Sequence, residues 1–336
     1  MSDLVTLDEI RTAQKRIVGV AVRTAAYRVS RARLQMAGVV GPEFDLYIKA
    51  ESEQPIGSFK LRGAYNMVAQ LSREVLERGV ITYSSGNHAQ GVAYAARALG
   101  TKAVIVMPGN APAVKKEATA ALGAEIVEVG PSSSERRLEA EELAEKFGYA
   151  IIPPYDNAAI IAGQGTCGLE ILEQVPGVDL VIAPVSGGGL LSGVATAVKL
   201  SAPGVQVWGA EPELAADAKE SFETKRLVEW EASRTTRTMG DGLRTQSLGA
   251  LNFEHVLRYV DGIVAVSEEE ILAAMRVMLG ATKLVPEPSG AVALAAALYH
   301  AAELPKVRKV VVVMSGGNLD PELLGKLRSE QTGGAS

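Results

Sequence analysis

Short hydrophobic runs alternate along the chain with longer stretches in which hydrophobic residues recur every three or four positions. The first pattern predicts strands and the second predicts helices. Strands are predicted at 79–83, 103–107, 125–129, 149–152, 179–185, 205–210, 263–266 and 309–314. Helices are predicted at 60–70, 88–99, 112–122, 132–147, 158–173, 190–200, 268–280, 289–302 and 321–329. Because strand and helix alternate, we expect an α/β fold with doubly wound, mostly parallel sheets.

Local patterns refine this picture. The run 310–314 is apolar at every position, which is typical of a strand buried on both faces. Thr6 and Glu9 form a capping box before a helical repeat. The region 81–152 holds four strand–helix units and is expected to form a small inserted subdomain. The stretch 211–245 is polar and is predicted to be a loop.

Composition limits the class of protein. The 336 residues are 47% hydrophobic and 22% charged, which is ordinary for a globular chain of about two domains. The net charge of −5, with no basic run, argues against a nucleic-acid partner. The single cysteine, Cys167, excludes an internal disulfide and, with three scattered histidines, a zinc cluster. No apolar run approaches the length of about 18 residues that spans a membrane, so we expect a cytoplasmic protein.

Lys60 is the first candidate for chemistry. A reactive lysine must lose its proton, and burial or a nearby cation assists this. Phe59 precedes it and could form a wall of the site, and Arg62 follows two residues later. Taken alone, this segment favours a solvated lysine at the start of a helix.

A polar turn, Ser84 to His88, follows a predicted strand and opens a helix. Amides at a helix N-terminus attract anions, so this turn could bind a substrate carboxylate. Ser85 could transfer a proton, and Asn87 could donate a hydrogen bond to a cofactor oxygen. The alternative is a plain capping turn. His88 by itself is expected to be structural.

Two glycine-rich turns follow other predicted strands. Ser186, Gly187, Gly188, Gly189 and Leu190 form one of them, in which successive amides can face one phosphate. This turn is neither a Rossmann nor a Walker motif. Ser-Gly-Gly-Asn at 315–318 is the other. Because the C-terminal ends of strands in a doubly wound sheet share one crevice, all the polar turns are expected to open on it.

An acidic segment, 211–217, follows another predicted strand. Its two carboxylates and a backbone carbonyl have a spacing that could hold Mg²⁺ or Ca²⁺. From spacing alone a solvated acidic loop is the simpler interpretation.

Together these segments resemble the β-family (fold type II) of pyridoxal-phosphate enzymes, and most closely the serine/threonine dehydratase and serine racemase group. The resemblance extends from about Ile10 to Leu327. Four motifs carry it, in this order: Ser-Phe-Lys-Leu-Arg-Gly-Ala at 58–64, Ser-Ser-Gly-Asn-His-Ala-Gln-Gly at 84–91, Ser-Gly-Gly-Gly-Leu-Leu-Ser-Gly at 186–193 and Ser-Gly-Gly-Asn at 315–318.

The resemblance implies a tryptophan synthase β-like fold with two doubly wound α/β domains and the cofactor in the cleft between them. The large domain would comprise 1–68 and 158–336, and the small one 69–157. A homodimer is also implied, with no nucleic-acid or membrane partner.

The resemblance also assigns roles to single residues. Lys60 would bind the cofactor aldehyde covalently and take the Cα proton, and Ser85 would be the second proton donor. Further cofactor contacts would come from Phe59, Asn87, Ser186, Gly187, Gly188, Gly189, Leu190 and Ser315. Substrate contacts would come from Ser84, Ser85, Gly86, Asn87 and His88. A divalent cation, Mg²⁺ or another, would be held by Glu211, Ala215 and Asp217.

The expected reaction is α,β-elimination from a β-hydroxy amino acid, with threonine and serine as first candidates, to a 2-oxo acid and ammonia. A hydroxyl such as that of Ser315 at the pyridine nitrogen leaves the ring neutral and a weaker electron sink, which suits elimination. Serine racemisation is the rival within the family. Ile56 and Glu53 depart from the family pattern and leave the β-substituent of the substrate open, and the apolar Ile56 favours a bulkier substrate such as 3-phenylserine. An amino-acid sensor without turnover and a nucleotide-binding protein are the alternatives of other classes.

Overall fold

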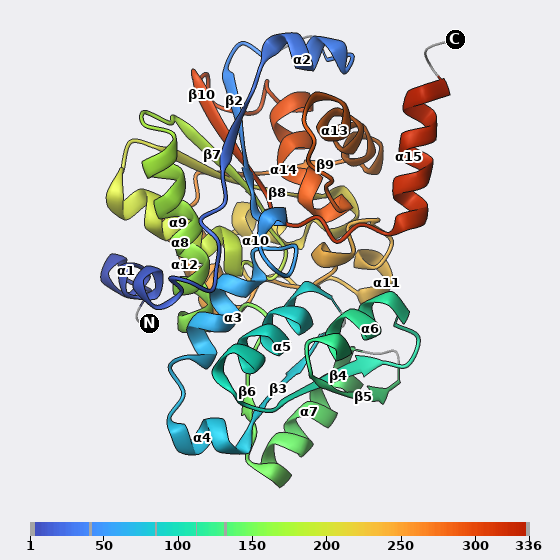
Figure 1. The fold of residues 1–336 in the computed structure, drawn as a ribbon. Helices are drawn as coiled ribbons and strands as arrows, with labels where there is room; N and C mark the ends of the chain where they lie inside the picture. Colours follow the sequence, from blue (N-terminus) through green and yellow to red (C-terminus); the bar gives the residue numbers. More distant parts are fainter. Residues whose placement is uncertain (1–3, 40–41, 85, 112, 131–132, 334–336) are drawn as a thin grey trace.

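Two sheets, each covered by helices, make up the chain in a computed structural model (Figure 1). The structure describes residues 4–39, 42–84, 86–111, 113–130 and 133–333. Within these residues the large sheet has six strands in the order β1-β2-β10-β7-β8-β9, and the small sheet has four in the order β5-β4-β3-β6. The predicted α/β class with mostly parallel sheets is therefore confirmed.

Segments from both ends of the chain form the large sheet. Its strands are β1 (Ala26–Val29), β2 (Asp45–Ala50), β10 (Lys309–Met314), β7 (Leu180–Pro184), β8 (Gln206–Pro212) and β9 (Gly262–Val266). Strand β1 is antiparallel to β2, and the other neighbours are parallel. The valine run of β10 lies between β2 and β7 and is buried on both faces, as predicted.

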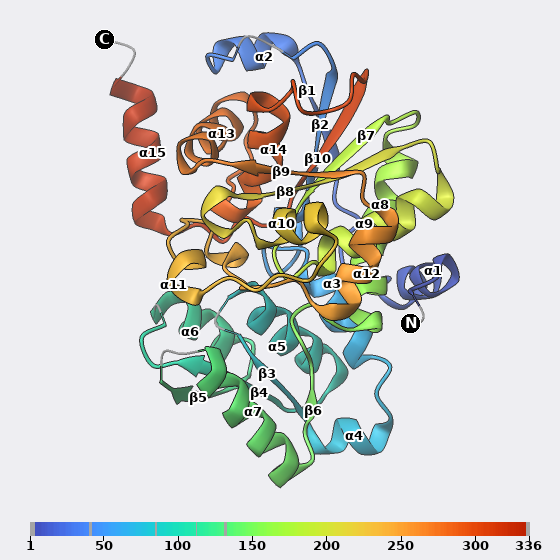
Figure 2. The ribbon, with the colours of Figure 1, turned by 180° about the vertical axis from the view of Figure 1, so that it is seen from behind.

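The two faces of the large sheet pack against different helices (Figures 1 and 2). Val310 and Val312 face a core built with α13 (Glu268–Ala281) and α14 (Pro288–Tyr299). Val311 and Val313 face a core built with α8 (Ala158–Gln174), α9 (Gly189–Ser201) and α12 (Ala250–Tyr259). The outer parts of this unit are α1 (Leu7–Arg16), α2 (Arg31–Met36), α10 (Asp217–Thr224), α11 (Ala232–Thr235), α15 (Pro321–Gly333) and the 3-10 turns η1 (Glu51–Glu53), η2 (Glu213–Ala215) and η3 (Asp241–Leu243).

The small sheet comes from one continuous region and is parallel throughout. Ile81 and Val104 pack against one flanking helix, α7, and Val80 and Ile105 pack against another, α5. The strands are β3 (Val80–Tyr83), β4 (Ala103–Pro108), β5 (Glu125–Val129) and β6 (Ala150–Ile151), and the helices are α3 (Lys60–Val68), α4 (Arg73–Arg78), α5 (Asn87–Leu99), α6 (Ala113–Ala121) and α7 (Ser133–Phe147). The division of the chain into domains at 68/69 and 157/158 stays a prediction.

One prediction of a loop is wrong. The stretch 211–245 contains η2, α10, α11 and η3. These helices are short, and one of them, α10, packs Ala218 into the core that it shares with β9 and α12. A helix that contributes so little apolar surface leaves only a faint periodic pattern. The capping box of α1 is confirmed, because the Glu9 amide donates to the Thr6 hydroxyl at 3.3 Å and the Thr6 amide to the Glu9 carboxylate at 2.7 Å.

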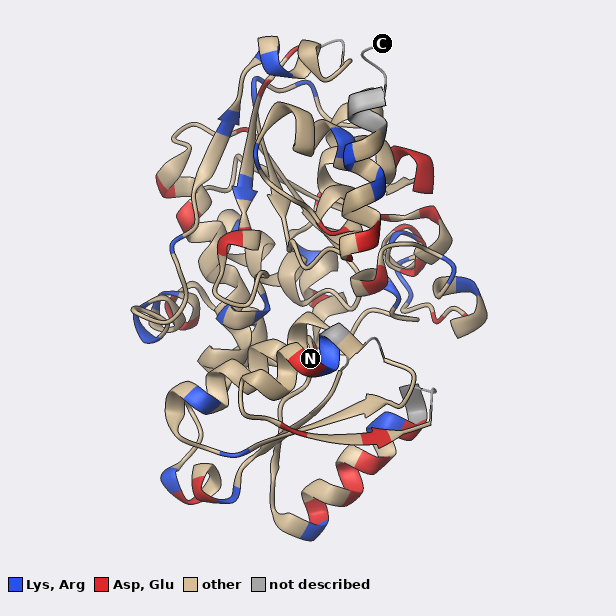
Figure 3. Ribbon diagram, turned by 45° about the vertical axis from the view of Figure 1, so that its right-hand side comes forward, with Lys and Arg blue, Asp and Glu red and all other residues tan. Residues whose placement is uncertain are grey.

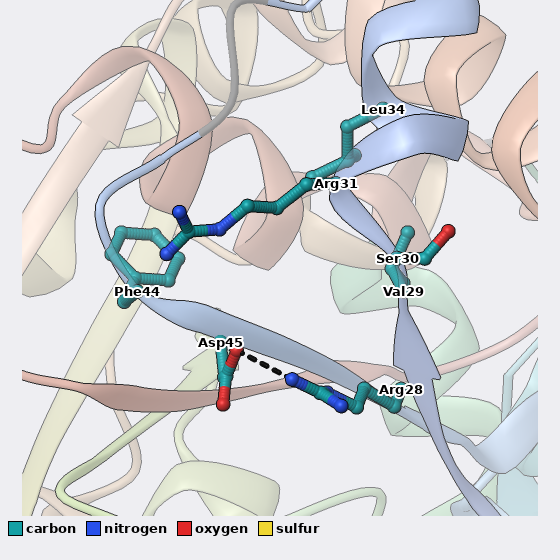
Figure 4. A pocket seen from close by; sticks show the side chains of 7 residues that line it. All are labelled: Arg28, Val29, Ser30, Arg31, Leu34, Phe44 and Asp45. Atoms are coloured by element: carbon teal, nitrogen blue, oxygen red, sulfur yellow. Dashed lines mark hydrogen bonds and ion pairs between the residues drawn. The ribbon is translucent and has the colours of Figure 1, made fainter.

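Basic and acidic residues are interspersed over both sheets in the view of Figure 3. Among the described residues, no helix is both long and apolar enough to cross a membrane. A cavity of about 200 Å³ lies between β1 and the start of α2, where the Arg28 guanidinium is paired with Asp45 at 2.9 Å (Figure 4). It contains none of the candidate residues.

Candidate active site

Backbone hydrogen bonds join the lysine segment to the Ser-Gly-Gly-Asn turn. The Phe59 amide donates to the Ser315 carbonyl at 3.0 Å, and the Gly317 amide donates to the Gly57 carbonyl at 2.9 Å. Gly57 has φ of +73°, and a Cβ there would lie 2.3 Å from Oδ1 of Asn318. Both its backbone conformation and the space around it therefore require glycine.

Lys60 is the first residue of α3 and is partly buried. Its Nζ donates to the Pro154 carbonyl at 2.7 Å and lies 5.3 Å from the centre of the Phe59 ring. Burial lowers the pKa of this amine to about 8. A much larger fraction is therefore neutral near pH 7 than for a free lysine, which is the state that a nucleophile or a base needs.

The triple-glycine turn connects β7 to α9. Gly188, at the N-cap of α9, has φ of +98°, and no side chain of the described residues caps this helix. A Cβ on Gly187 would lie 2.4 Å from the Tyr155 ring. The hydroxyls of Ser186 and Thr245 share a hydrogen bond of 2.6 Å, which fixes the start of the turn. The uncapped amides of Gly189 and its successor, Leu190, can therefore serve an anion such as a phosphate.

The Ser84–His88 turn connects β3 to α5. The Ser84 hydroxyl accepts from the Gly86 amide at 3.3 Å, and Gly86 provides no side chain to cap α5. Ser85 lies outside the described residues. The start of α5 is therefore a second place where helix amides can meet an anion, as the carboxylate prediction requires.

Asn87 and His88 begin α5 and have different surroundings. Nδ2 of Asn87 donates to Oε1 of Glu287 at 2.7 Å, and its Oδ1 accepts from Nδ2 of Asn318 at 2.7 Å. His88 is buried and pairs Nε2 with the Ile152 carbonyl at 2.9 Å. Burial, and then the charge of Lys60, lower the His88 pKa to about 3. A permanently neutral, carbonyl-bound imidazole fits the structural role that the sequence suggests.

The polar turns lie at the edges of two sheets. The turns after β7 and β10 share the C-terminal edge of the large sheet, because these strands are parallel neighbours. The turn after β3 belongs to the small sheet and reaches the turn after β10 through the contact of Asn87 with Asn318. This separation arises because the small sheet places β3 outside the large one.

Two residues with no predicted role join the site. Glu287 is 4% exposed, precedes α14 and receives the Asn87 hydrogen bond. Burial, and then the negative charge of Asp241, raise the Glu287 pKa to about 8. Tyr155 covers Gly187, and burial raises the pKa of its hydroxyl to about 12. An acid directly before a helix-starting proline was the only local signal for Glu287.

The Ser315 hydroxyl lies at the C-terminal end of β10. It is 4% exposed and donates weakly to the Ser289 carbonyl at 3.4 Å. Of the residues that depart from the family pattern, Ile56 is buried beside this turn and its carbonyl accepts from Asn318 at 2.9 Å. Glu53 is exposed and accepts from the Tyr27 hydroxyl at 2.6 Å, so it is engaged on β1 instead.

The predicted cation ligands lie one strand away from the glycine turn. Glu211 is the penultimate residue of β8, and its carboxylate accepts from the Lys219 amide at 2.6 Å. Asp217 begins α10 and is 1% exposed, and neither carboxylate oxygen has a partner in another described residue. Burial raises the pKa of Asp217 to about 7. Ala215, between them, is buried in η2. Within the described part, no group of three or more His, Cys, Asp or Glu side chains could hold a metal, so a site here depends on a carbonyl ligand.

A two-sheet α/β fold with a readily deprotonated lysine and an uncapped, glycine-led helix start defines an enzyme that could hold an anionic carbonyl cofactor. Residues 29–316 match the model of a family described as pyridoxal-phosphate dependent enzymes, and the chain belongs to this family.

Individual relatives narrow the group. The chain is 42% identical over 324 residues to an L-threonine ammonia-lyase of Thermotoga maritima, which covers 96% of this chain and 78% of that protein. It is 41% identical to an L-threo-3-hydroxyaspartate ammonia-lyase of Saccharomyces cerevisiae, and the match covers 86% of this chain and 87% of that protein. The solved structure of maize serine racemase superposes with a TM-score of 0.90 at 37% identity and 99% coverage of both chains. The predicted fold type II and the dehydratase–racemase group are therefore confirmed.

Proposed function

We propose that the protein is a pyridoxal-phosphate-dependent ammonia-lyase that acts on a small β-hydroxy amino acid, with L-threonine and L-serine as first candidates. The observation that carries the proposal is the partly buried Lys60 amine, whose pKa is lowered to about 8, joined through Phe59 to a turn that begins with a hydroxyl residue, Ser315. Two of the relatives above are ammonia-lyases, in accord with the predicted carbon–nitrogen lyase.

The residues present fit the cofactor. The uncapped start of α9 behind Ser186–Leu190 would bind its phosphate, and the Phe59 ring would border its pyridine ring. Asn87 would donate to its phenolic oxygen, and the Ser315 hydroxyl would face its ring nitrogen. When bound, the cofactor supplies an electron sink for the negative charge that develops at Cα of the substrate.

The chain's own groups supply the remaining steps. The Lys60 amine takes the Cα proton when neutral, and the Pro154 carbonyl that it contacts holds it in place. The start of α5, at Gly86 and Asn87, orients the substrate carboxylate through its amides. Ser85 is proposed as the second proton donor. With a neutral partner at the ring nitrogen, departure of the β-hydroxyl group competes well against reprotonation at Cα.

Serine racemisation is the alternative activity, and its support is the maize serine racemase, which shares the fold over 99% of both chains. The decisive experiment measures 2-oxo acid release and D-serine formation on L-threonine, L-serine, L-threo-3-hydroxyaspartate and 3-phenylserine. We expect oxo acid as the main product from threonine or serine. Activity on 3-phenylserine alone would move the substrate class to bulkier β-substituents.

Lys60→Ala tests the amine directly. We expect this variant to lose the visible absorption of the bound cofactor, its covalent fixation by borohydride, and turnover. Lys102→Ala is the matched control, because Lys102 is an exposed lysine paired with Glu125 on the small sheet. Wild-type protein that stays colourless with pyridoxal phosphate would contradict the proposal and favour a nucleotide-binding protein. A band without turnover on any substrate would favour a sensor.

We also propose that Glu211, Ala215 and Asp217 hold a divalent cation such as Mg²⁺. Two buried Asp217 oxygens without partners are costly unless protonation or a cation compensates them. Mg²⁺ should raise the melting temperature of wild type but not of Asp217→Asn; an equal rise in both would refute the site. The homodimer stays a prediction, to be tested by sedimentation.

A further inference from the structure

We infer that Glu287 and Asn318 are positioning residues that hold the Asn87 carboxamide in a single orientation, with one N–H directed at the cofactor. This inference rests on the proposed function, in which Asn87 donates to the phenolic oxygen. It accounts for residues of the Ser-Gly-Gly-Asn turn and for a buried acid to which the proposed mechanism gives no role.

The Asn318 amide can be assigned without ambiguity. Its Nδ2 lies 2.9 Å from the Ile56 carbonyl, which can only accept. The same Nδ2 lies 2.7 Å from the Asn87 side chain. Because Asn318 donates at both contacts, the Asn87 atom that faces it must be oxygen. The nitrogen of Asn87 then faces Glu287.

Glu287 confirms this orientation from the other side. Its Oε1 lies 2.7 Å from Nδ2 of Asn87 and accepts that hydrogen bond. A flipped Asn87 amide would place nitrogen against the Asn318 nitrogen, so that contact would be lost, and its oxygen could face Glu287 only if a protonated carboxyl group donated to it. The two neighbours therefore select one of the two amide orientations.

The backbone around Glu287 is shaped for this contact. Its amide donates to the Gly316 carbonyl at 3.2 Å, which ties the start of α14 to the turn after β10. A Cβ on Gly316 would lie 2.1 Å from Oε1 of Glu287. Glycine at 316 thus leaves the room that the carboxyl group occupies, and a larger residue would push it away from Asn87.

The two contacts of Asn87 use its Oδ1 and one of the two N–H groups of Nδ2. The second N–H of Nδ2 therefore stays available. A donor held from both sides loses little freedom when it meets its acceptor, which strengthens binding without an added contact. Loss of either neighbour should therefore weaken cofactor binding while leaving Lys60 and the glycine turn intact.

The test uses the apo-protein and two probes, pyridoxal 5′-phosphate and pyridoxine 5′-phosphate. The second probe keeps the phenolic oxygen and the phosphate but has no aldehyde, so it reports binding apart from the bond to Lys60. We expect Glu287→Leu and Asn318→Leu each to raise the dissociation constant of both probes about tenfold, which equals about 1.4 kcal/mol. The visible absorption maximum of the bound aldehyde should also move.

Glu287→Gln keeps a side-chain oxygen that accepts from Asn87, so it should stay within about twofold of wild type. Glu270→Leu is the control for loss of an acid elsewhere, because Glu270 caps α13 and contacts His300. It should leave both probes unaffected. Should Glu287→Leu fail to fold, Asn318→Leu carries the test from the other end.

The outcomes separate the two levels of the argument. Wild-type protein that binds neither probe would overturn the proposed function, and this inference with it. Wild-type binding with unchanged constants and spectra in both leucine variants would overturn only the positioning role. Equal losses in Glu287→Leu and Glu287→Gln would also overturn it, since the glutamine keeps the acceptor.

Discussion

Arg62 lies at the centre of a buried charge network next to the active lysine, and its replacement by methionine gives the sharpest test of the structure. Its guanidinium is fully buried and binds Glu51 at 2.7 Å and Glu170 at 2.8 Å. Lys49, also fully buried, binds Glu170 at 2.6 Å. The four charges sum to zero, and Arg62 occupies α3 two residues after Lys60.

Arg62→Met removes one of the two cations and keeps the length and apolar bulk of the side chain. Glu51 and Glu170 then share only Lys49, so one negative charge stays uncompensated in the interior. Removing one partner of a buried pair costs about 3–5 kcal/mol. We therefore expect the free energy of unfolding to fall by about that amount near neutral pH, a large share of a typical total of about 5–15 kcal/mol.

The loss should depend on pH with a defined sign. Burial by itself raises the Glu51 pKa, but the charges of Arg62 and Lys49 and the hydrogen bonds outweigh it and hold the pKa below its usual value. In wild type this stabilisation is present above the unfolded pKa of about 4.3 and is lost as pH falls through the folded pKa. In Arg62→Met the Glu51 pKa rises, so the carboxyl protonates sooner and the difference from wild type shrinks with falling pH.

Urea unfolding followed by circular dichroism, at about pH 8 and about pH 5, measures both effects. Arg23→Met is the matched control, because Arg23 pairs with Glu173 at a similar 2.9 Å while their side chains are 56% and 50% exposed. Such exposed pairs contribute about 0–1 kcal/mol. Equal losses in Arg62→Met and Arg23→Met, or a loss that grows as pH falls, would refute the reasoning.

Other variants test other parts of the structure. Gly188→Ala forces an alanine into φ of +98° with its Cβ 2.7 Å from Asn252, so pyridoxal-phosphate affinity measured by titration should fall about fivefold or more, from about 1–3 kcal/mol of strain. Asp156→Ala removes the acceptor of three α12 amides, the shortest at 3.0 Å, and urea unfolding should show a loss of about 0.5–2 kcal/mol. Thr6→Ala removes the capping box with Glu9, and the free energy of unfolding should fall by about 1 kcal/mol. Unchanged cofactor affinity in Gly188→Ala, or unchanged stability in Asp156→Ala or Thr6→Ala, would contradict the corresponding prediction.

Apolar runs and periodicity were sufficient for the most deeply buried elements. The run that became β7 is apolar throughout, and that of β10 is apolar from Val310 to Met314; α9, which follows β7, and α14, which precedes β10, are rich in buried apolar residues and were predicted as helices. The strands β1 and β2 escaped prediction because charged residues interrupt them. Lys49 in β2 is fully buried only because Glu170, 121 positions later, neutralises it. No local pattern contains that partner.

The distinction between local patterns and distant partners also holds for the candidate active site. The turns after β3, β7 and β10 could be identified because glycine and polar residues follow a strand, which is a local signal. Glu287 could not, because Asn87, which gives its carboxyl group a place in the site, is 200 residues away. In the structure β3 belongs to a separate sheet, so its turn meets the turn after β10 only through the long-range contact of Asn87 with Asn318.

The connector 154–157 shows how these distant parts become one site. The Pro154 carbonyl accepts from the Lys60 amine at 2.7 Å, and the Tyr155 ring covers Gly187. The Asp156 carboxylate caps α12, and the Asn157 side chain caps α8 by accepting from the Ala159 amide at 2.8 Å. Four successive residues thus fix the amine, the glycine turn and two helices of the large sheet. Since β6 of the small sheet ends just before them, any shift of that sheet displaces the amine's acceptor and the cover of the glycine turn together.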